Sequence, residues 1–346
     1  MKRKITLIPG DGIGPEIMAS VKSIFSALEA PIEWEEENAG LSTLSSRGEL
    51  LPKSLLKSLE ANKVGLKGPI TTPVGEGFRS VNIQLRQHFD LFANIRPCKS
   101  LDAVPTRFRN VDLVIIRENT EGLYSGLENY DERLGIVDSI ARVTKRGCER
   151  IVRAGFNYAK QNHRAKVTLV HKANILKQAG AMLLNAGKAI SPEYAGITME
   201  DLIIDNMCMQ LVTRPERYDV IVTTNLFGDI LSDLAAGLVG GLGVAAGANI
   251  GSNVAVFEAV HGSAPDIAGK NIANPTAILK SSIMMLHYLG EEELALKLDR
   301  AIDETLASRE QRTADLGGTA GTTQFTDHII RHLEKDEVHP VHHSSY

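Results

Sequence analysis

The sequence is poor in cysteine, and it lacks the long apolar runs that membrane proteins need. Three cysteines, at positions 98, 148 and 208, occur in 346 residues, and no two of them have CxxC spacing. This odd number and spacing argue against a disulfide framework or a zinc site and favour a reducing cytoplasm. No apolar stretch reaches the roughly 18 residues of a membrane span. The N-terminal apolar run is interrupted by Pro9 and Gly10, so we expect no signal peptide.

An excess of one charge is also absent. The chain has 38 Lys and Arg against 42 Asp and Glu, and its net charge of −4 gives no general attraction to nucleic acid or to a membrane. We therefore expect neither as a partner. Apolar residues make up 43% and charged residues 23% of the chain, as in soluble globular proteins with a full core. The length suits two domains or one large α/β unit.

Short apolar runs alternate with amphipathic segments along the whole chain. The runs predict buried strands over residues 4–8, 34–39, 64–67, 111–116, 167–171, 220–224 and 254–259. The segments between them predict helices, including 51–60, 144–161, 275–290, 294–306 and 326–334. This alternation predicts an α/β architecture with a largely parallel sheet.

Glycines at positions 10, 12 and 14 follow the first predicted strand. They resemble a dinucleotide-binding fingerprint, but Pro15 stands where the last glycine of that pattern is required. The alternative is a tight turn from strand to helix, with Pro15 at the first helical position. A Rossmann nucleotide site is therefore a weak interpretation of this loop.

Two aspartates lie four residues apart in a predicted helix. At this spacing Asp229 and Asp233 project from one helical face, where two like charges repel each other. A hard divalent cation such as Mg²⁺ or Mn²⁺ would neutralise them through carboxylate oxygens. The alternative is that Asp229 caps the helix and Asp233 is solvated. Asn225 is a further candidate for the cap.

A group of polar residues follows the flexible loop that contains Gly75 and Gly77. Because arginine binds carboxylates bidentately, two arginines near such a loop suit a polyanionic small molecule. The alternative is that the serine only caps a helix and that the first arginine lies at the surface. The members of this group are Ser80, Asn82, Arg86 and Arg96.

Other candidate residues follow the ends of predicted strands, where ligands of α/β proteins bind. Arg117 and Tyr124 come after the strand at 111–116, and Lys172 comes directly after the strand at 167–171. Partial burial would lower the pKa of Lys172 and make it a base, whereas the alternative is a surface lysine. Asp205 is a third carboxylate next to an apolar segment.

The sequence resembles a known protein family over nearly its whole length, from the segment IPGDGIGPEI to the segment TADLGGTAGT. The segments NLFGDILSDLAAGLVGGLG (225–243) and HGSAPDIAGKNIANP (261–275) are its most specific motifs. The chain resembles the β-decarboxylating dehydrogenases, the family of isocitrate and isopropylmalate dehydrogenases. The resemblance implies an NAD-dependent oxidoreductase of the tricarboxylic acid cycle that converts isocitrate to 2-oxoglutarate and CO₂ with Mg²⁺ or Mn²⁺.

The resemblance also implies an α/β fold that is distinct from the Rossmann fold, with a cleft between two α/β domains. A large, cofactor-binding domain would comprise residues 1–99 and 253–346. A small domain, 100–252, would carry the dimer interface and most metal and substrate residues. The implied assembly is a homodimer or higher homo-oligomer in which each cleft borrows residues from the partner.

Site residues are carried over from the family motif by motif. Substrate binding is implied for Ser80, Asn82, Arg86, Arg96 and Arg117. The acid and base would be Tyr124 and Lys172, and the metal ligands Asp205, Asp229 and Asp233, with Lys172 and Asp205 provided by the partner. Cofactor contacts are implied for Thr72, His261, Gly262, Ala264, Asp266, Ile267 and Asn274.

The resemblance implies that two positions determine the choice between NAD and NADP. Asp266 and Ile267 stand where NADP-dependent relatives have Lys and Tyr, and an aspartate favours the ribose hydroxyls of NAD over a 2′-phosphate. Ala314 and Gly318 agree with NAD.

Substrate choice rests on Ser80 and Asn82. They suit the γ-carboxylate of isocitrate, because isopropylmalate relatives have an apolar residue in place of Asn82. Homoisocitrate or isopropylmalate remain alternative substrates, and a regulatory subunit of a heteromeric enzyme is the non-catalytic alternative. Phosphorylation of Ser80 would repel that carboxylate.

Overall fold

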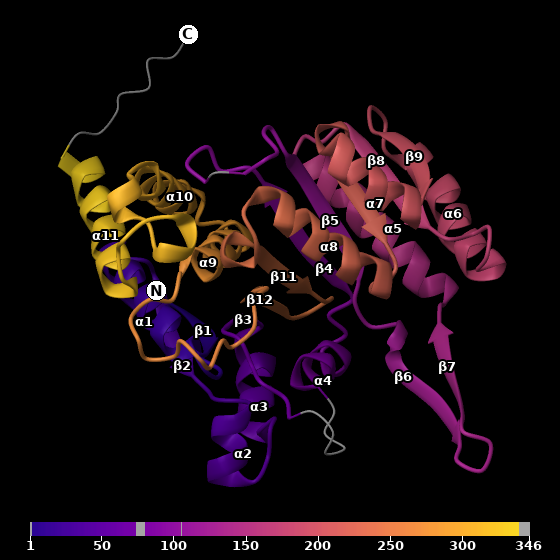
Figure 1. The fold of residues 1–346 in the computed structure, drawn as a ribbon, viewed down its shortest axis with the longest axis horizontal. Coiled ribbons are helices and arrows are strands. Elements are labelled where there is room, and N and C mark those ends of the chain that lie inside the picture. Colours follow the sequence, from indigo (N-terminus) through magenta and orange to yellow (C-terminus); the bar gives the residue numbers. More distant parts are fainter. Residues whose placement is uncertain (1, 74–79, 105, 339–346) are drawn as a thin grey trace.

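The structure is a computed structural model that describes residues 2–73, 80–104 and 106–338. A ten-stranded sheet runs through it, with helices on both faces (Figure 1). The strands follow the order β2 (Ile32–Glu36), β1 (Arg3–Ile8), β3 (Val64–Lys67), β12 (Ala255–Ala259), β11 (Ala246–Ile250), β4 (Ala93–Lys99), β5 (Asp112–Glu118), β10 (Val220–Thr223), β8 (Lys166–His171) and β9 (Thr198–Ile203). The predicted α/β class is confirmed.

Strand direction divides this sheet into three parts. The pairs from β2 to β12 and from β5 to β9 are parallel, as predicted. The pairs β12–β11, β11–β4 and β4–β5 in the middle are antiparallel, which the sequence did not predict. The sheet therefore places β4, with Arg96, beside β5, with Arg117.

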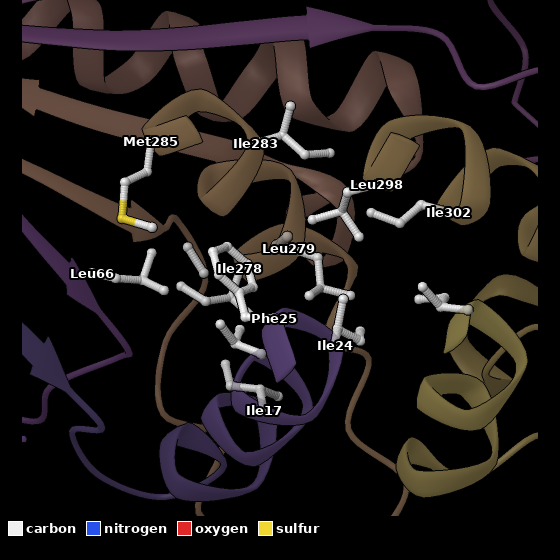
Figure 2. Close-up of a cluster of buried hydrophobic side chains, with 14 of the residues drawn as sticks. Ile17, Ile24, Phe25, Leu66, Ile278, Leu279, Ile283, Met285, Leu298 and Ile302 are labelled. Carbon is white, nitrogen blue, oxygen red and sulfur yellow. The ribbon is translucent and has the colours of Figure 1, made fainter. Parts of the chain in front are cut away.

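Helices from both ends of the chain cover the first part of the sheet. They are α1 (Gly14–Ala27), α9 (Thr276–Leu289), α10 (Glu292–Ala307) and α11 (Thr322–Val338). Ile17 and Ile24 of α1 pack with Ile278 and Leu279 of α9 in one buried cluster (Figure 2). Burying each such side chain contributes about 1.5–3 kcal/mol. Segments from opposite ends of the sequence are thus joined in one core.

The second part of the sheet has two helical layers. Val220 and Val222 of β10 face the core beneath α5 (Lys145–Gln161) and α6 (Lys177–Ile190). Ile221, between them, faces α7 (Ile204–Thr213) and α8 (Asn225–Val239). Strands buried on both faces read as continuous apolar runs, which explains why β5, β8 and β10 were predictable.

The loop at Gly10 to Gly14 forms the predicted tight turn before α1, with Pro15 in the first turn. Gly12 has a φ of 60°, and a Cβ there would lie 1.9 Å from the carbonyl oxygen of Ser263. The backbone amide of Ile13 donates to that same oxygen at 2.9 Å. The glycines therefore let two loops of the protein meet. The predicted tight turn is present, with Pro15 as the second helical residue and not the first.

A hairpin of β6 (Gly122–Asp131) and β7 (Ile136–Arg142) projects from the body (Figure 1). It exposes Tyr130 (63%) and Val137 (54%), and every residue of β7 is exposed. This hairpin was not predicted, since its apolar side chains face away from the core. Among the described residues, no helix is long and apolar enough to cross a bilayer.

The smaller helices α2 (Leu41–Arg47), α3 (Lys53–Asn62) and α4 (Val81–His88) lie near the first part of the sheet. β4 pairs with both β11 and β5, so the ladder is continuous between the two predicted domains. The division at residues 99 and 253 stays a prediction.

Candidate active site

The two aspartates of α8 face a pair of arginines from the middle of the sheet. Arg117 contacts Asp229 through Nη1, and Tyr124 of β6 donates its hydroxyl to the same carboxylate. Arg96 lies 3.3 Å from Asp233 and 3.9 Å from Asp229. The prediction of one shared helical face is therefore consistent with the geometry, and the neutralising charges in the single chain are guanidinium groups.

The helix begins differently from the expectation. α8 starts at Asn225 with Thr224 before it, so the predicted capping role of Asn225 is wrong. Its side-chain oxygen instead accepts from Nε and Nη2 of Arg117, at 3.0 and 2.7 Å. Asp229 lies one turn into the helix and is not a cap either. Asn225 is thus a supporting residue that the sequence analysis did not recognise.

Electrostatics at this cluster follow from burial and from the arginines. Burial and the bond to Asp229 raise the pKa of Tyr124, so its phenol stays protonated and available as a proton donor. Burial opposes the charge of Asp229, but Arg117, Tyr124 and Arg96 outweigh it and lower the pKa of that carboxyl. Burial, and then repulsion from Arg86, lower the pKa of Arg117 to about 10, and it remains charged at neutral pH.

The side chain of Arg86, on α4, contacts a buried ion pair. Its Nη2 lies 3.4 Å from Oε1 of Glu258, whose other oxygen is 2.7 Å from Nζ of Lys67. The side chains of Lys67 and Glu258 are 4% and 8% exposed. The interpretation of Arg86 as a surface residue is therefore wrong. The sequence contains one signal of this ion pair, because each of two apolar strands carries a charged residue. Nothing in the sequence indicates that these two residues contact each other.

Replacing Glu258 by Gln is expected to lower the free energy of unfolding by about 3–5 kcal/mol at pH 7, because it leaves the buried Lys67 unpaired. Burial disfavours the charge of Glu258, yet Lys67 and Arg86 hold its pKa far below the ordinary 4.5. Its stabilising contribution is therefore complete above pH 4.5 and is lost as the pH falls towards the folded-state pKa.

Urea unfolding at neutral and acidic pH measures this effect. The deficit of Glu258→Gln should shrink as the pH drops below about 4.5. Glu35→Gln is the matched control, since Glu35 accepts bonds from Ser58 and Asn62 but is 38% exposed. A deficit for Glu258→Gln no larger than that of the control would contradict the assignment.

Ser80 and Asn82 stand at the start of α4. Ser80 caps the helix, as its Oγ accepts from the amide of Ile83 at 3.5 Å. Oδ1 of Asn82 is buried and has no hydrogen-bond partner among the described residues. Gln87 of the same helix donates to the carbonyl of Tyr124 at 3.5 Å, so α4 lies against β6. The loop with Gly75 and Gly77 lies outside the described residues.

The residues predicted to bind the cofactor gather on neighbouring loops. Thr71 and Ser263 share a hydrogen bond of 2.6 Å, which brings Thr72 close to the loop of His261. Nε2 of His261 is buried without a partner in the described part of the chain, and burial lowers the pKa of this ring. Next to it, Gly262 is exposed and Ala264 has a φ of 38° in a tight turn.

The rest of this loop presents polar groups around the turn. Asp266 is exposed, and Ile267 is half-buried against the core. Asn274 donates to Asp315 at 2.9 Å and accepts from the amide of Thr276 at 2.9 Å. Helix α9 begins at Thr276, one residue later than predicted, and its N-cap residue is Pro275 and not Asn274.

In the described part of the chain, Lys172 and Asp205 make no ion pair or hydrogen bond with the arginines or aspartates of this cluster. They form an ion pair with each other, and their side chains are 26% and 70% exposed. The bond from Lys172 lowers the pKa of Asp205. Nowhere in the described residues do three or more His, Cys, Asp or Glu gather as a metal site. One chain thus brings Asp229 and Asp233 together but leaves Asp205 elsewhere, which fits a third ligand from a second copy.

Clustered arginines that face two carboxylates, on an α/β sheet, are a site chemistry that suits a small anionic ligand. The chain belongs to the isocitrate/isopropylmalate dehydrogenase family, whose sequence model matches residues 4–329. This confirms the predicted family and the prediction of a dehydrogenase.

Individual relatives agree over nearly the whole chain. The chain is 50% identical to a mitochondrial regulatory subunit of isocitrate dehydrogenase (NAD) from Dictyostelium discoideum, covering 96% of this chain and 92% of that one. It is also 50% identical to the mitochondrial isocitrate dehydrogenase (NAD) catalytic subunit 5 of Arabidopsis thaliana, covering 95% and 88%. The crystal structure of isocitrate dehydrogenase from Methylococcus capsulatus superposes with a TM-score of 0.92 at 49% identity, covering 96% and 99%.

Proposed function

We propose that the chain catalyses the NAD-dependent oxidative decarboxylation of isocitrate to 2-oxoglutarate and CO₂ with a divalent metal ion. The carrying observation is the cluster of Arg96, Arg117, Tyr124 and the α8 aspartates. The Dictyostelium and Arabidopsis relatives, named regulatory and catalytic, are equally identical to this chain, so similarity alone does not choose between these roles. The presence of every predicted catalytic side chain supports the catalytic one.

Substrate recognition would come from three arginines of three elements. Arg86, Arg96 and Arg117 would bind the substrate carboxylates through paired hydrogen bonds. Ser80 and Asn82 would meet the γ-carboxylate. The amide oxygen of Asn82, which is buried and has no partner in the part of the chain that the structure describes, supports a polar substrate here. Against an isopropyl group that amide would cost about 1–3 kcal/mol in lost hydrogen bonding, which favours isocitrate over isopropylmalate.

The residues present fit the metal ion and the cofactor that the family implies. Asp229 and Asp233, with Asp205 of the partner subunit, offer the hard carboxylate oxygens that Mg²⁺ or Mn²⁺ prefers. A bound divalent ion would lower the pKa of the substrate hydroxyl and stabilise the charge that develops on decarboxylation. Asp266 would accept from the ribose hydroxyls of NAD, which supplies the hydride acceptor. Nε2 of His261, which is buried and has no partner among the described residues, is a further polar atom on the same loop.

Two side chains would move protons. Lys172 of the partner subunit would take the proton of the C2 hydroxyl, directly or through water. Tyr124 would protonate C3 after CO₂ has left. Its raised pKa supports this role, because the phenol holds its proton until the carbanion forms. Arg117, which bonds Asp229 in the single chain, would turn part of its guanidinium to the substrate.

A homodimer is part of the proposal, since one chain holds an incomplete site. Exposed apolar side chains on the hairpin, α7 and α8 support an interface, notably Val137 (54%), Met209 (48%) and Ile230 (51%). Such a face is unusual on a monomer's surface when its side chains gather on adjoining elements. A cytoplasmic location remains a prediction; the Dictyostelium and Arabidopsis relatives are mitochondrial by name.

Steady-state assays of the purified chain test the proposal. Isocitrate, homoisocitrate and isopropylmalate are each combined with NAD or NADP, with Mg²⁺ or Mn²⁺ and with a chelator. We expect isocitrate with NAD to give the highest kcat/KM, and the chelator to abolish turnover. Faster turnover of another acid would overturn the substrate assignment. Absence of turnover by the chain alone, with turnover restored by a second, different subunit, would favour the regulatory role.

A further inference from the structure

A row of buried polar side chains crosses the antiparallel middle of the sheet behind the arginines. Glu258 of β12, Asn249 of β11 and Asn94 of β4 are 6%, 2% and 0% exposed. Asn249 and Asn94 are directly opposed in the β11–β4 ladder. We call these three residues the amide relay. Its two ends reach Arg86, at 3.4 Å from Glu258, and Arg96, at 2.8 Å from Asn94.

Hydrogen-bond polarity fixes the orientation of each amide in turn. The carboxylate of Glu258 only accepts, so Nδ2 of Asn249 faces it at 2.7 Å. The oxygen of Asn249 then faces Nδ2 of Asn94 at 2.9 Å. The oxygen of Asn94 is left to accept from Nε of Arg96 at 2.8 Å. The buried negative charge of Glu258 thereby determines that Asn94 presents its oxygen, an acceptor, and not its NH₂ group to Arg96.

The surrounding groups reinforce these orientations. Nδ2 of Asn249 also lies 3.3 Å from the carbonyl of Val256, and its oxygen accepts a second bond, of 2.9 Å, from Asn119. With its Nε held by Asn94, Arg96 directs Nη1 to Ser232 at 2.6 Å and towards Asp233. The guanidinium is therefore held in one plane, which bidentate recognition of a carboxylate requires.

We propose that Asn249 and Asn94 are positioning residues for substrate binding, which transmit the polarity of Glu258 to Arg96 and so tie the placement of Arg96 to that of Arg86. This inference rests on the proposed function, because it assumes that these arginines bind the substrate carboxylates. The donor and acceptor directions run consistently from the carboxylate at one end of the row to the guanidinium at the other.

The test compares Asn249→Ser and Asn94→Ser with the unaltered protein in the isocitrate and NAD assay. Each variant should raise the KM for isocitrate about tenfold, since a bond to a charged group is lost. The KM for NAD should stay within about twofold, because the relay ends at arginines and not at the cofactor loops. Asn62→Ser is the matched control, as Asn62 donates to Glu35 at 2.7 Å and its other recorded partners are Thr6 and Ser58, none of them an arginine. It should leave both constants unchanged.

Melting temperatures separate positioning from folding. If Asn249→Ser fails to fold, Asn94→Ser decides, because it leaves the bond between Asn249 and Glu258 intact. A folded Asn94→Ser protein with an unchanged KM for isocitrate would overturn the proposal, as would equal rises in both KM values or the failure of both variants to fold. If the unaltered protein turns over another hydroxy acid instead, the proposed function fails, and the relay is then measured by the KM of that acid.

Discussion

Mixing two inactive variants, Lys172→Met and Asp229→Asn, is expected to restore activity. Each change alone should lower kcat about 10²–10⁴-fold, since Lys172 is the proposed base and Asp229 a proposed metal ligand. In a mixed dimer, one site would receive the intact Asp229 of one chain and the intact Lys172 of the other. The second site would contain both defects. With random exchange, half of the dimers are mixed and half of their sites work, so about a quarter of the original activity should return.

The measurement is kcat after the variants are co-refolded or co-expressed at equal amounts. Asp229→Asn mixed with Tyr124→Phe is the matched control. Both of these residues belong to the cluster of one chain, where the Tyr124 hydroxyl contacts Asp229, so each site of the mixed dimer carries one defect. The control should stay inactive. Restoration in the control, or its absence in the test mixture when mixed dimers are detected, would refute the shared site.

Changing Asp266 to Lys together with Ile267 to Tyr is expected to move cofactor preference towards NADP by about 100-fold or more in the ratio of kcat/KM values. The exposed carboxylate of Asp266 would repel a 2′-phosphate at the proposed cofactor site, and a lysine would attract it. The half-buried Ile267 packs on the core, so we expect a smaller effect from its replacement alone.

Kinetics with both cofactors at saturating substrate provide the measurement. Asp102→Lys makes the same charge change at another exposed position and should leave the preference untouched. A double variant that still prefers NAD to the original degree would show that the ribose is recognised by other residues. The KM for isocitrate serves as an internal reference, because neither position contacts the arginine cluster.

The parts of the fold that were predictable from the sequence are those with a strong local signal. β5, β8 and β10 are buried on both faces and form apolar runs. β11 was missed because its sequence, AGANI, is made mostly of small residues and an asparagine. The order of the strands in the sheet could not be predicted, since no local sequence pattern indicates that residues 255–259 pair with residues 64–67.

The candidate site likewise has residues whose placement was predictable from local sequence and residues whose placement was not. The spacing of Asp229 and Asp233 predicted their common face, because one helix sets that geometry. Glu258 and Asn249 were not recognised, since their partners come from strands that are neighbours only in the folded sheet. A charge or an amide in an apolar strand signals a buried polar partner, but the partner is fixed by strand order. Residues that a second chain would supply, as proposed for Lys172 and Asp205, are the extreme case of this limit.

The position of β12 between β3 and β11 has a consequence for synthesis. β1, β2 and β3 leave the ribosome long before β12, their next neighbour in the sheet, which begins only at Ala255. Until then β3 presents an open edge of backbone groups, and α1 lacks the apolar surface of α9 that covers it. The nascent first third of the chain is therefore an incomplete layer that invites pairing with other chains. This topology makes the protein a candidate client for chaperones that shield strand edges until β12 has been translated.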